Sequence, residues 1–118
     1  DLLTCEAKDE LIPTAVDEDV AVICASPLHG GLLGSKRDHW MEQGRFPELY
    51  DRLRLVEDML AGEDEPIERL GLRYLLSDPN VSVVLSGVAD IEELEASVSV
   101  SDGQVLDEGM IEEIEAVV

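Results

Sequence analysis

Two glycine-containing segments of the sequence each follow a short apolar run. Gly30 and Gly31 come after Val20–Ala25, and Gly87 comes after Val81–Leu85. Glycine has no Cβ atom and therefore lets the backbone approach a ligand closely. The second segment leads into Asp90, which we expect to cap a helix, and free N–H groups at a helix N-terminus bind anions such as phosphate. Both segments are candidates for contact with a phosphate-bearing ligand, and turn formation is the alternative explanation of their glycines.

Other residues capable of chemistry lie mainly in residues 29–46, which the sequence predicts to be a long loop. Loops of this length are usually functional or mobile. We expect His29 to be an exposed loop histidine, and Trp40 either to form part of a substrate lid or to fill the loop. Tyr50 and Tyr74 fall on predicted helices, where we expect them to be packing residues. Choosing an acid and a base among the 28 acidic residues would be arbitrary, so we predict no glycosidase-like pair.

The elements that must position these segments can be read from apolar spacing. Val20–Ala25 and Val81–Leu85 are short and rich in β-branched residues, which predicts strands of a parallel sheet that are buried on both faces. Five helices are expected, starting near Leu11, Pro47, Pro66, Asp90 and Asp107. Their predicted buried positions include Leu49, Leu53, Val56 and Leu60, then Ile67, Leu70 and Tyr74, then Ile91, Leu94 and Val98, and finally Met110, Ile114 and Val117.

The alternation of strands and helices predicts an α/β protein with crossover helices between parallel strands. Two strands alone do not make a stable sheet, so we expect further strands from the rest of a protein or from another chain. The sequence begins at Asp1 without an initiator methionine, which suits a fragment.

Composition limits the possible partners. The net charge is −20, from 28 acidic and eight basic side chains, and such a surface repels nucleic acid and anionic membranes. This excess of acids fits either a high-salt habitat or an ordinary acidic enzyme. Cys5 and Cys24 form no CxxC motif, so we predict no metal site and a reducing, cytoplasmic compartment. No apolar stretch approaches the about 20 residues of a membrane span.

Two longer segments resemble the aldo/keto reductase family. Residues 20–33, VAVICASPLHGGLL, resemble its seventh barrel strand and the following Ser-Pro-Leu and Gly-Leu-Leu loop. Residues 70–98, LGLRYLLSDPNVSVVLSGVADIEELEASV, resemble its next helix, eighth strand and cofactor loop. The lead-in Glu10–Pro13 also fits. The resemblance extends over nearly the whole chain, and the order and spacing of the motifs agree with it.

This resemblance implies a fold and a function. Residues 1–118 would be a single partial domain, the C-terminal portion of a (β/α)₈ TIM barrel with about strands 7 and 8 and their helices; a complete barrel has about 250 residues. The intact protein would be an NAD(P)-dependent oxidoreductase acting on a carbonyl, an alcohol or a sugar. The family's catalytic Asp, Tyr, Lys and His come from the first four strands, so this chain alone is expected to be inactive and to need the missing N-terminal part of the barrel. The alternative is a non-catalytic binding module resembling potassium-channel β-subunits.

The resemblance also implies which residues line the cofactor. Residues 26–31 would hold the pyrophosphate side and residues 86–97 the adenosine side. The candidate cofactor-binding residues are Ala25, Ser26, Pro27, Leu28, Gly30, Gly31, Ser86, Gly87, Val88, Glu93 and Ser97.

Several of these residues depart from the family pattern. Ala25 stands where the family often has an aromatic residue that stacks on the nicotinamide. This small residue resembles the L-galactose and D-threo-aldose dehydrogenase branch. Gly87, Val88 and Glu93 replace the basic residue, the Ser or Thr, and the Arg that hold the 2′-phosphate of NADPH. A carboxylate at position 93 would repel that phosphate, so we predict NAD rather than NADP. Glu93 also lies three residues after Asp90, which is the spacing of a helix capping box.

Overall fold

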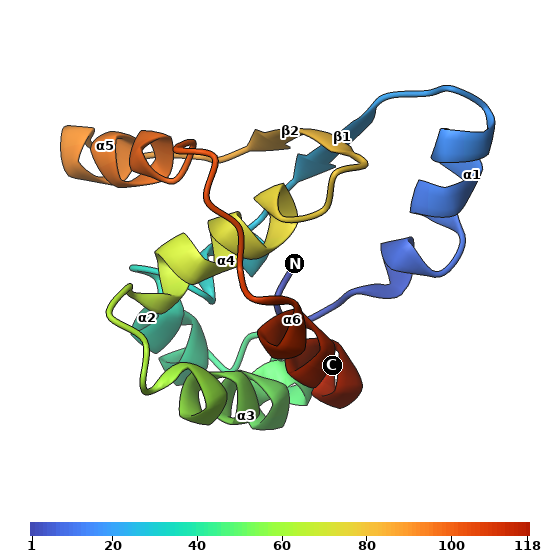
Figure 1. The fold of residues 1–118 in the computed structure, drawn as a ribbon. Coiled ribbons are helices and arrows are strands. Elements are labelled where there is room, and N and C mark those ends of the chain that lie inside the picture. Colours follow the sequence, from blue (N-terminus) through green and yellow to red (C-terminus); the bar gives the residue numbers. More distant parts are fainter.

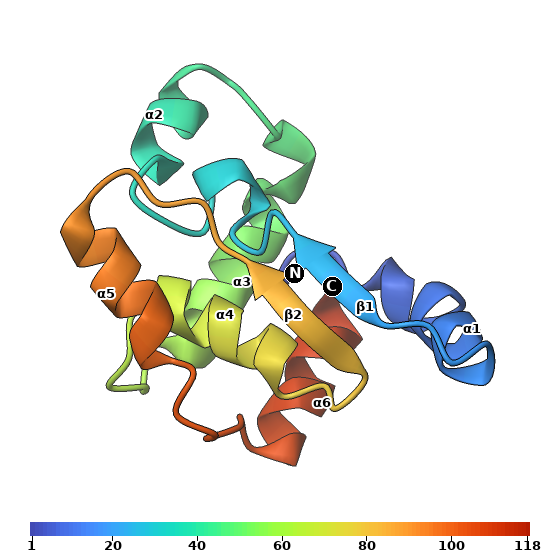
Figure 2. The same ribbon diagram turned by 90° about the horizontal axis from the view of Figure 1, so that it is seen from above.

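The sheet of the computed structural model, which describes residues 1–118, consists of two short strands, β1 (Val22–Ala25) and β2 (Val81–Leu85). The strands are parallel, with Ile23 opposite Val83 and Ala25 opposite Leu85. The register shifts between Val22 and Ile23, where the Val22 N–H donates to the Ser82 hydroxyl at 3.2 Å. Both arrowheads in Figure 2 point toward the loops that follow the strands, so these loops share one edge of the sheet.

Helices make up most of the remaining chain (Figure 1). Three short 3₁₀ helices, η1, η2 and η3, accompany six α-helices. In chain order these elements are η1 (Glu6–Lys8), α1 (Leu11–Asp17), η2 (His29–Gly31), α2 (Arg37–Glu42), η3 (Pro47–Leu49), α3 (Tyr50–Leu60), α4 (Ile67–Leu76), α5 (Ile91–Ser99) and α6 (Glu108–Val117). Helix α4 lies against β2, while α1 stands apart from the other helices in both views (Figures 1 and 2). None of these helices combines the length and the apolar character that crossing a membrane requires.

The hydrophobic core lies among the helices rather than on the sheet. The predicted stripe of α3 is confirmed, because Leu49, Leu53, Val56 and Leu60 are all buried. This stripe packs with side chains from the N-terminal segment, the loop after η2, α4 and α6, namely Leu2, Leu3, Leu32, Leu33, Leu70, Tyr74, Leu106 and Ile114. The segment that follows β1 is therefore anchored in the helical core through Leu32 and Leu33.

Two sequence predictions about element boundaries are wrong. The first strand begins at Val22 and not at Val20, because Asp19 adopts a positive φ of 54° and the chain turns there. Residues 29–46 are not one long loop, since they contain η2 and α2. Helix α2 has no buried residue and carries no apolar stripe, so periodicity gave no signal for it.

The prediction that both strands are buried on both faces is also wrong for this chain. Ile23, Val83 and Leu85 are 60%, 43% and 55% exposed. The predicted inward positions of α5, Ile91, Leu94 and Val98, are likewise exposed, and Val117 of α6 is only partly covered. The physical reason is that no segment among residues 1–118 lies over these surfaces, although their apolar spacing is that of a buried face.

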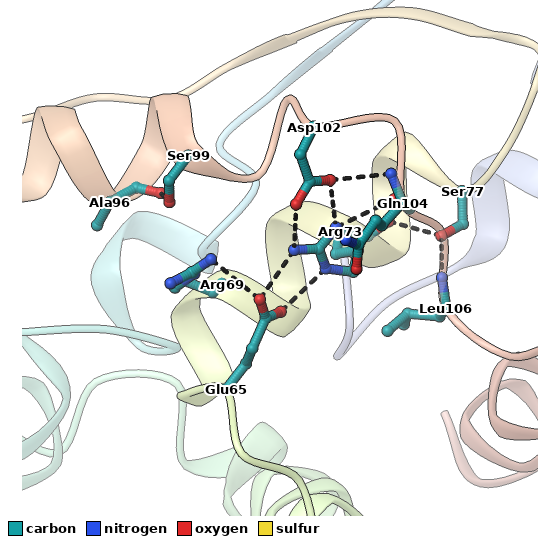
Figure 3. A network of polar contacts seen from close by, with 9 residues as sticks. All are labelled: Glu65, Arg69, Arg73, Ser77, Ala96, Ser99, Asp102, Gln104 and Leu106. Carbon is teal, nitrogen blue, oxygen red and sulfur yellow. Dashed lines mark hydrogen bonds and ion pairs between the residues drawn. The ribbon is translucent and has the colours of Figure 1, made fainter.

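A buried arginine connects α4 to the segment that leads into α6 (Figure 3). Arg73 is 4% exposed and binds two carboxylates through paired hydrogen bonds. Its Nε and Nη2 atoms donate to Glu65 at 2.9 and 2.8 Å, and its Nη1 and Nη2 atoms donate to Asp102 at 2.8 and 3.2 Å. Nη1 also donates to the Gln104 carbonyl at 3.1 Å. The hydrogen bond from Arg73, with a second from the Gln104 N–H, lowers the pKa of Asp102 to about 2.

This pKa predicts how Asp102 contributes to stability. A carboxylate whose pKa is lower in the folded protein stabilises it above the unfolded pKa, here 3.8, and loses that contribution as the pH falls toward 2. Asp102→Asn should therefore lower the free energy of unfolding above about pH 5, with the difference from wild type vanishing near pH 2. Urea unfolding at several pH values measures this difference. Asp58→Asn is the matched control, since the exposed Asp58 side chain has no hydrogen-bond or ion-pair partner; a constant difference for Asp102→Asn down to pH 2 would contradict the prediction.

Candidate functional site

A cleft of about 650 Å³ opens at the edge of the sheet where both strands end. Three segments line it: the loop after β1, the first half of α4 with the preceding Pro66, and the loop after β2 with one face of α5. The lining residues, called the cleft below, are Ser26, Pro27, Leu28, Gly30, Gly31, Gly34, Ser35, Lys36, Pro66, Glu68, Arg69, Leu72, Ser86, Gly87, Val88, Ala89, Glu92, Glu93, Ala96 and Ser97. Sites outside the carboxyl ends of parallel strands are the usual place for ligands in α/β sheets.

The structure brings the two sequence-predicted segments together in this cleft. Of the eleven candidate residues, all except Ala25 line it: Ser26, Pro27, Leu28, Gly30, Gly31, Ser86, Gly87, Val88, Glu93 and Ser97. Ala25 is the last residue of β1 and lies outside the lining. Residues about 60 positions apart in the sequence thus meet because parallel pairing places the ends of β1 and β2 side by side.

The glycines of the cleft serve two different purposes. Gly30 and Gly31 have positive φ values of 64° and 96°, and a Cβ atom on Gly31 would lie 3.1 Å from the Lys36 Cβ atom. These glycines are required by the turn itself. Gly87 has no positive φ, and a Cβ atom there would meet nothing within 4 Å. A side chain at this position would meet no other atoms, so glycine is not required by packing here and leaves open space in the cleft.

Glu93 joins the two loops of the cleft. Its backbone N–H donates to the Asp90 carboxylate at 2.8 Å, so the predicted cap at the start of α5 is confirmed. The Glu93 carboxylate in turn accepts from the Ala89 N–H at 2.7 Å and from the Ser35 hydroxyl at 3.0 Å. Both of its oxygens are therefore engaged within the protein, and one of them closes a contact across the cleft.

These capping contacts change the expectation of an anion site at the N-terminus of α5. The N–H groups of Ala89 and Glu93 are already satisfied by carboxylates. Asp90, Glu92 and Glu93 also place negative charge at this terminus, which opposes a second anion there. The positive charges of the cleft lie elsewhere, on Lys36 and Arg69.

Ten residues of the cleft were not among the sequence candidates, and two of these, Lys36 and Arg69, are basic. Lys36 was part of the region predicted to be a loop, and its ammonium forms no ion pair with a carboxylate. Arg69 donates to Glu65 at 3.0 Å from α4, and its buried Nε atom has no hydrogen-bond partner. Their types were visible in the sequence. Their place in the cleft depends on the tertiary arrangement, so only the structure reveals it.

The aromatic and histidine side chains that the sequence singled out lie outside the cleft. Trp40 Nε1 donates to the Gly30 carbonyl at 3.0 Å, and this hydrogen bond stabilises the glycine turn. Tyr50 donates to the Arg45 carbonyl at 2.6 Å, and the buried Tyr74 donates to Glu115 at 3.0 Å, in agreement with structural roles.

The prediction that His29 is exposed is wrong. Its ring is half-buried, with Nδ1 3.0 Å from the Asp1 carboxylate and its edge against Phe46. This burial lowers the pKa of His29, and the nearby terminal amino group adds to the effect.

The side chains of this cleft provide several groups that can bind a ligand. The lining contains no tyrosine or histidine that could donate or accept a proton near neutral pH. This lining combines an open glycine position, the apolar residues Pro27, Leu28 and Leu72, two cations, and three carboxylates, one of which, Glu93, is already hydrogen-bonded within the protein. Such a surface suits a ligand that carries both flat apolar groups and anionic groups.

Comparison with known proteins agrees with this arrangement. The family model described as the aldo/keto reductase family matches residues 2–118. A D-threo-aldose 1-dehydrogenase from Pseudomonas sp. is 32% identical over 91 residues, which are 73% of this chain and 28% of that protein. An L-galactose dehydrogenase from Arabidopsis thaliana is 29% identical over 112 residues, which are 92% of this chain and 34% of that protein.

A solved aldo-keto reductase from Bacillus halodurans, in its holo form, superposes with a TM-score of 0.77 at 23% identity. The superposition covers 99% of this chain and 40% of that one, which shows a shared fold over this part. The chain spans about a third of the length of the two named dehydrogenases. Because the family match runs from residue 2 to residue 118, this chain belongs to the aldo/keto reductase family.

Proposed function

We propose that this chain is the cofactor-lining part of an NAD(P)-dependent oxidoreductase that acts on a carbonyl, an alcohol or a sugar. The observation that carries the proposal is the meeting of ten residues from two separate family-like motifs in one cleft. The nicotinamide cofactor would supply the hydride transfer, and the residues of this chain would bind and orient it. The family's catalytic Asp, Tyr, Lys and His would come from outside residues 1–118.

The two loops would hold different parts of the dinucleotide. Residues 26–31, whose glycine turn exposes backbone, would lie on the pyrophosphate side together with Lys36. Residues 86–97 would lie on the adenosine side, where the open position at Gly87 leaves space for the ligand. Ala25, at the end of β1, would face the nicotinamide end of the site only in the complete enzyme.

The uncovered apolar surfaces support a missing part of the barrel. Ile23 and Leu85 on the strands and Ile91 on α5 are more than half exposed. A two-stranded sheet is marginal by itself, and apolar faces of this extent are normally covered. We therefore propose that β1 and β2 are strands 7 and 8 of a (β/α)₈ barrel, and that the preceding strands cover these surfaces in a cytoplasmic enzyme.

The alternative is a non-catalytic barrel that keeps the cleft only to bind a dinucleotide. Such a binding module and an enzyme would have the same cleft, so the cleft does not distinguish them. The two named relatives are both dehydrogenases, which favours the enzyme. A Tyr and a Lys at strand ends upstream of this chain would support the enzyme, and their absence would support the binding module.

Cofactor choice provides the first test. The full-length protein should bind NADH more tightly than NADPH, because the Glu93 carboxylate repels a 2′-phosphate and no basic residue stands at positions 87 and 88. Glu93→Gln keeps the size of the side chain and removes its charge; its oxygen can still accept from the Ala89 N–H and its amide can donate to the Ser35 hydroxyl, so the preference for NADH should narrow severalfold. Fluorescence titration with both cofactors measures the ratio.

Glu95→Gln is the control for that titration, since Glu95 is an exposed residue of the same helix outside the cleft. Its preference should equal that of the wild type. Tighter binding of NADPH by the wild type would refute the prediction, and so would an unchanged ratio in Glu93→Gln.

The second prediction concerns which part of the enzyme supplies the catalytic residues. The isolated 118-residue chain should show no oxidoreductase turnover with NADH or NADPH, because the family's catalytic Asp, Tyr, Lys and His would come from outside residues 1–118. The full-length protein should turn over a carbonyl or sugar substrate under identical assay conditions. The measurement is the rate of cofactor oxidation, with the isolated chain and the full-length protein at equal molar concentrations. Measurable turnover by the isolated chain would contradict the prediction that its catalytic residues come from elsewhere.

A further inference from the structure

Arg69 is a cation in the wall of the cleft that α4 provides. Its side chain is 31% exposed, and Nη2 donates to Glu65 Oε1 at 3.0 Å. The Nε atom is buried and has no hydrogen-bond partner. A guanidinium has five N–H donors, so most of the donor capacity of Arg69 is unused. A buried Nε cannot reach a ligand, but Nη1 is not buried and makes no hydrogen bond within the protein, so it is the donor that a ligand in the cleft can use.

The partner of Arg69 is already committed to another residue. Both oxygens of Glu65 accept from Arg73, at 2.9 and 2.8 Å, and the hydrogen bond from Arg73 is the main cause of the lowered pKa of Glu65 (Figure 3). Arg69 shares only one of these oxygens. The ion pair with Glu65 therefore holds the Arg69 side chain in place without using all of its hydrogen-bonding capacity.

The position of Arg69 fits an anion bound between the two loops. Helix α4 contributes Pro66, Glu68, Arg69 and Leu72 to the cleft, between the Gly31–Lys36 turn and the start of α5. The Glu93 carboxylate, on α5, already accepts hydrogen bonds from the Ser35 hydroxyl and the Ala89 N–H. In a chain with 28 acidic and eight basic side chains, the two basic residues of the cleft are Lys36 and Arg69.

We propose that Arg69 is a ligand-contacting residue that donates to a phosphate oxygen of the bound dinucleotide. The planar guanidinium matches the geometry of phosphate and can bind it through two N–H groups. It would supply, from α4, the positive charge that Glu93 does not provide at the start of α5. This inference rests on the proposed function, because it requires that the cleft bind a dinucleotide.

The test measures the affinity of the full-length protein for NADH and for NADPH by titration, in wild type and in three variants. Arg69→Gln should weaken binding about tenfold, the usual loss for one charge-assisted hydrogen bond. Arg69→Lys should restore part of that affinity, because it keeps the charge but not the paired N–H groups of the guanidinium. Arg54→Gln is the matched control, since Arg54 is an exposed arginine of α3 outside the cleft and should bind like the wild type.

The pattern of losses identifies the phosphate. An equal loss for NADH and NADPH supports a contact with the pyrophosphate, and a loss confined to NADPH supports a contact with the 2′-phosphate. Wild-type affinity of Arg69→Gln for both cofactors overturns the inference, as does a loss that Arg69→Lys does not restore even in part. If the wild type binds neither cofactor, the proposed function itself fails, which is a distinguishable result.

Discussion

Parallel pairing of β1 with β2 places the two loops of the cleft side by side. Ala25 stands opposite Leu85, so the loops that begin at Ser26 and Ser86 leave the sheet at the same edge. Parallel strands need a crossover connection, and here it runs through α2, α3 and α4. The crossover also carries the buried stripe of α3 and brings α4 against β2. The same connection therefore supplies part of the core and one wall of the cleft.

Glu93 has a structural role at a position where the aldo/keto reductase family has a cofactor-binding residue. The sequence places its carboxylate where the family pattern has a phosphate-binding arginine. In the structure its oxygens complete the start of α5 and reach Ser35 on the opposite loop. The same residue therefore stabilises the walls of the cleft and sets its charge. A change to arginine at this position would remove both contacts as well as reverse the charge, which makes the isosteric glutamine the cleaner probe.

Local signals in the sequence were sufficient for much of the fold. Asp90 and Asp107 were recognised as caps because their side-chain oxygens accept backbone N–H groups within three residues. The stripe of α3 was recognised because four apolar residues at helical spacing leave little alternative. Ten of the eleven candidate site residues lie in one cleft because the two motifs that carry them each follow a strand.

The features that escaped prediction depend on distant contacts. Helix α2 has neither a cap nor a buried face, and its tertiary environment decides its structure. Ser35 and Glu93 are 58 positions apart, and Arg73 and Asp102 are 29 apart, so no local pattern connects them. The exposed Ile91, Leu94 and Val98 show the opposite error: their spacing correctly indicates an apolar face, but nothing within residues 1–118 covers it.

The central claim is that the loops after β1 and β2 form one dinucleotide site, and hydrogen exchange tests it most directly. Amide exchange of the full-length protein should be measured by mass spectrometry with and without saturating NADH. The account predicts that NADH slows exchange in both residues 26–36 and residues 86–97, while α1, which lies far from the cleft, exchanges at an unchanged rate. Binding of NADH without protection of these two segments would contradict it.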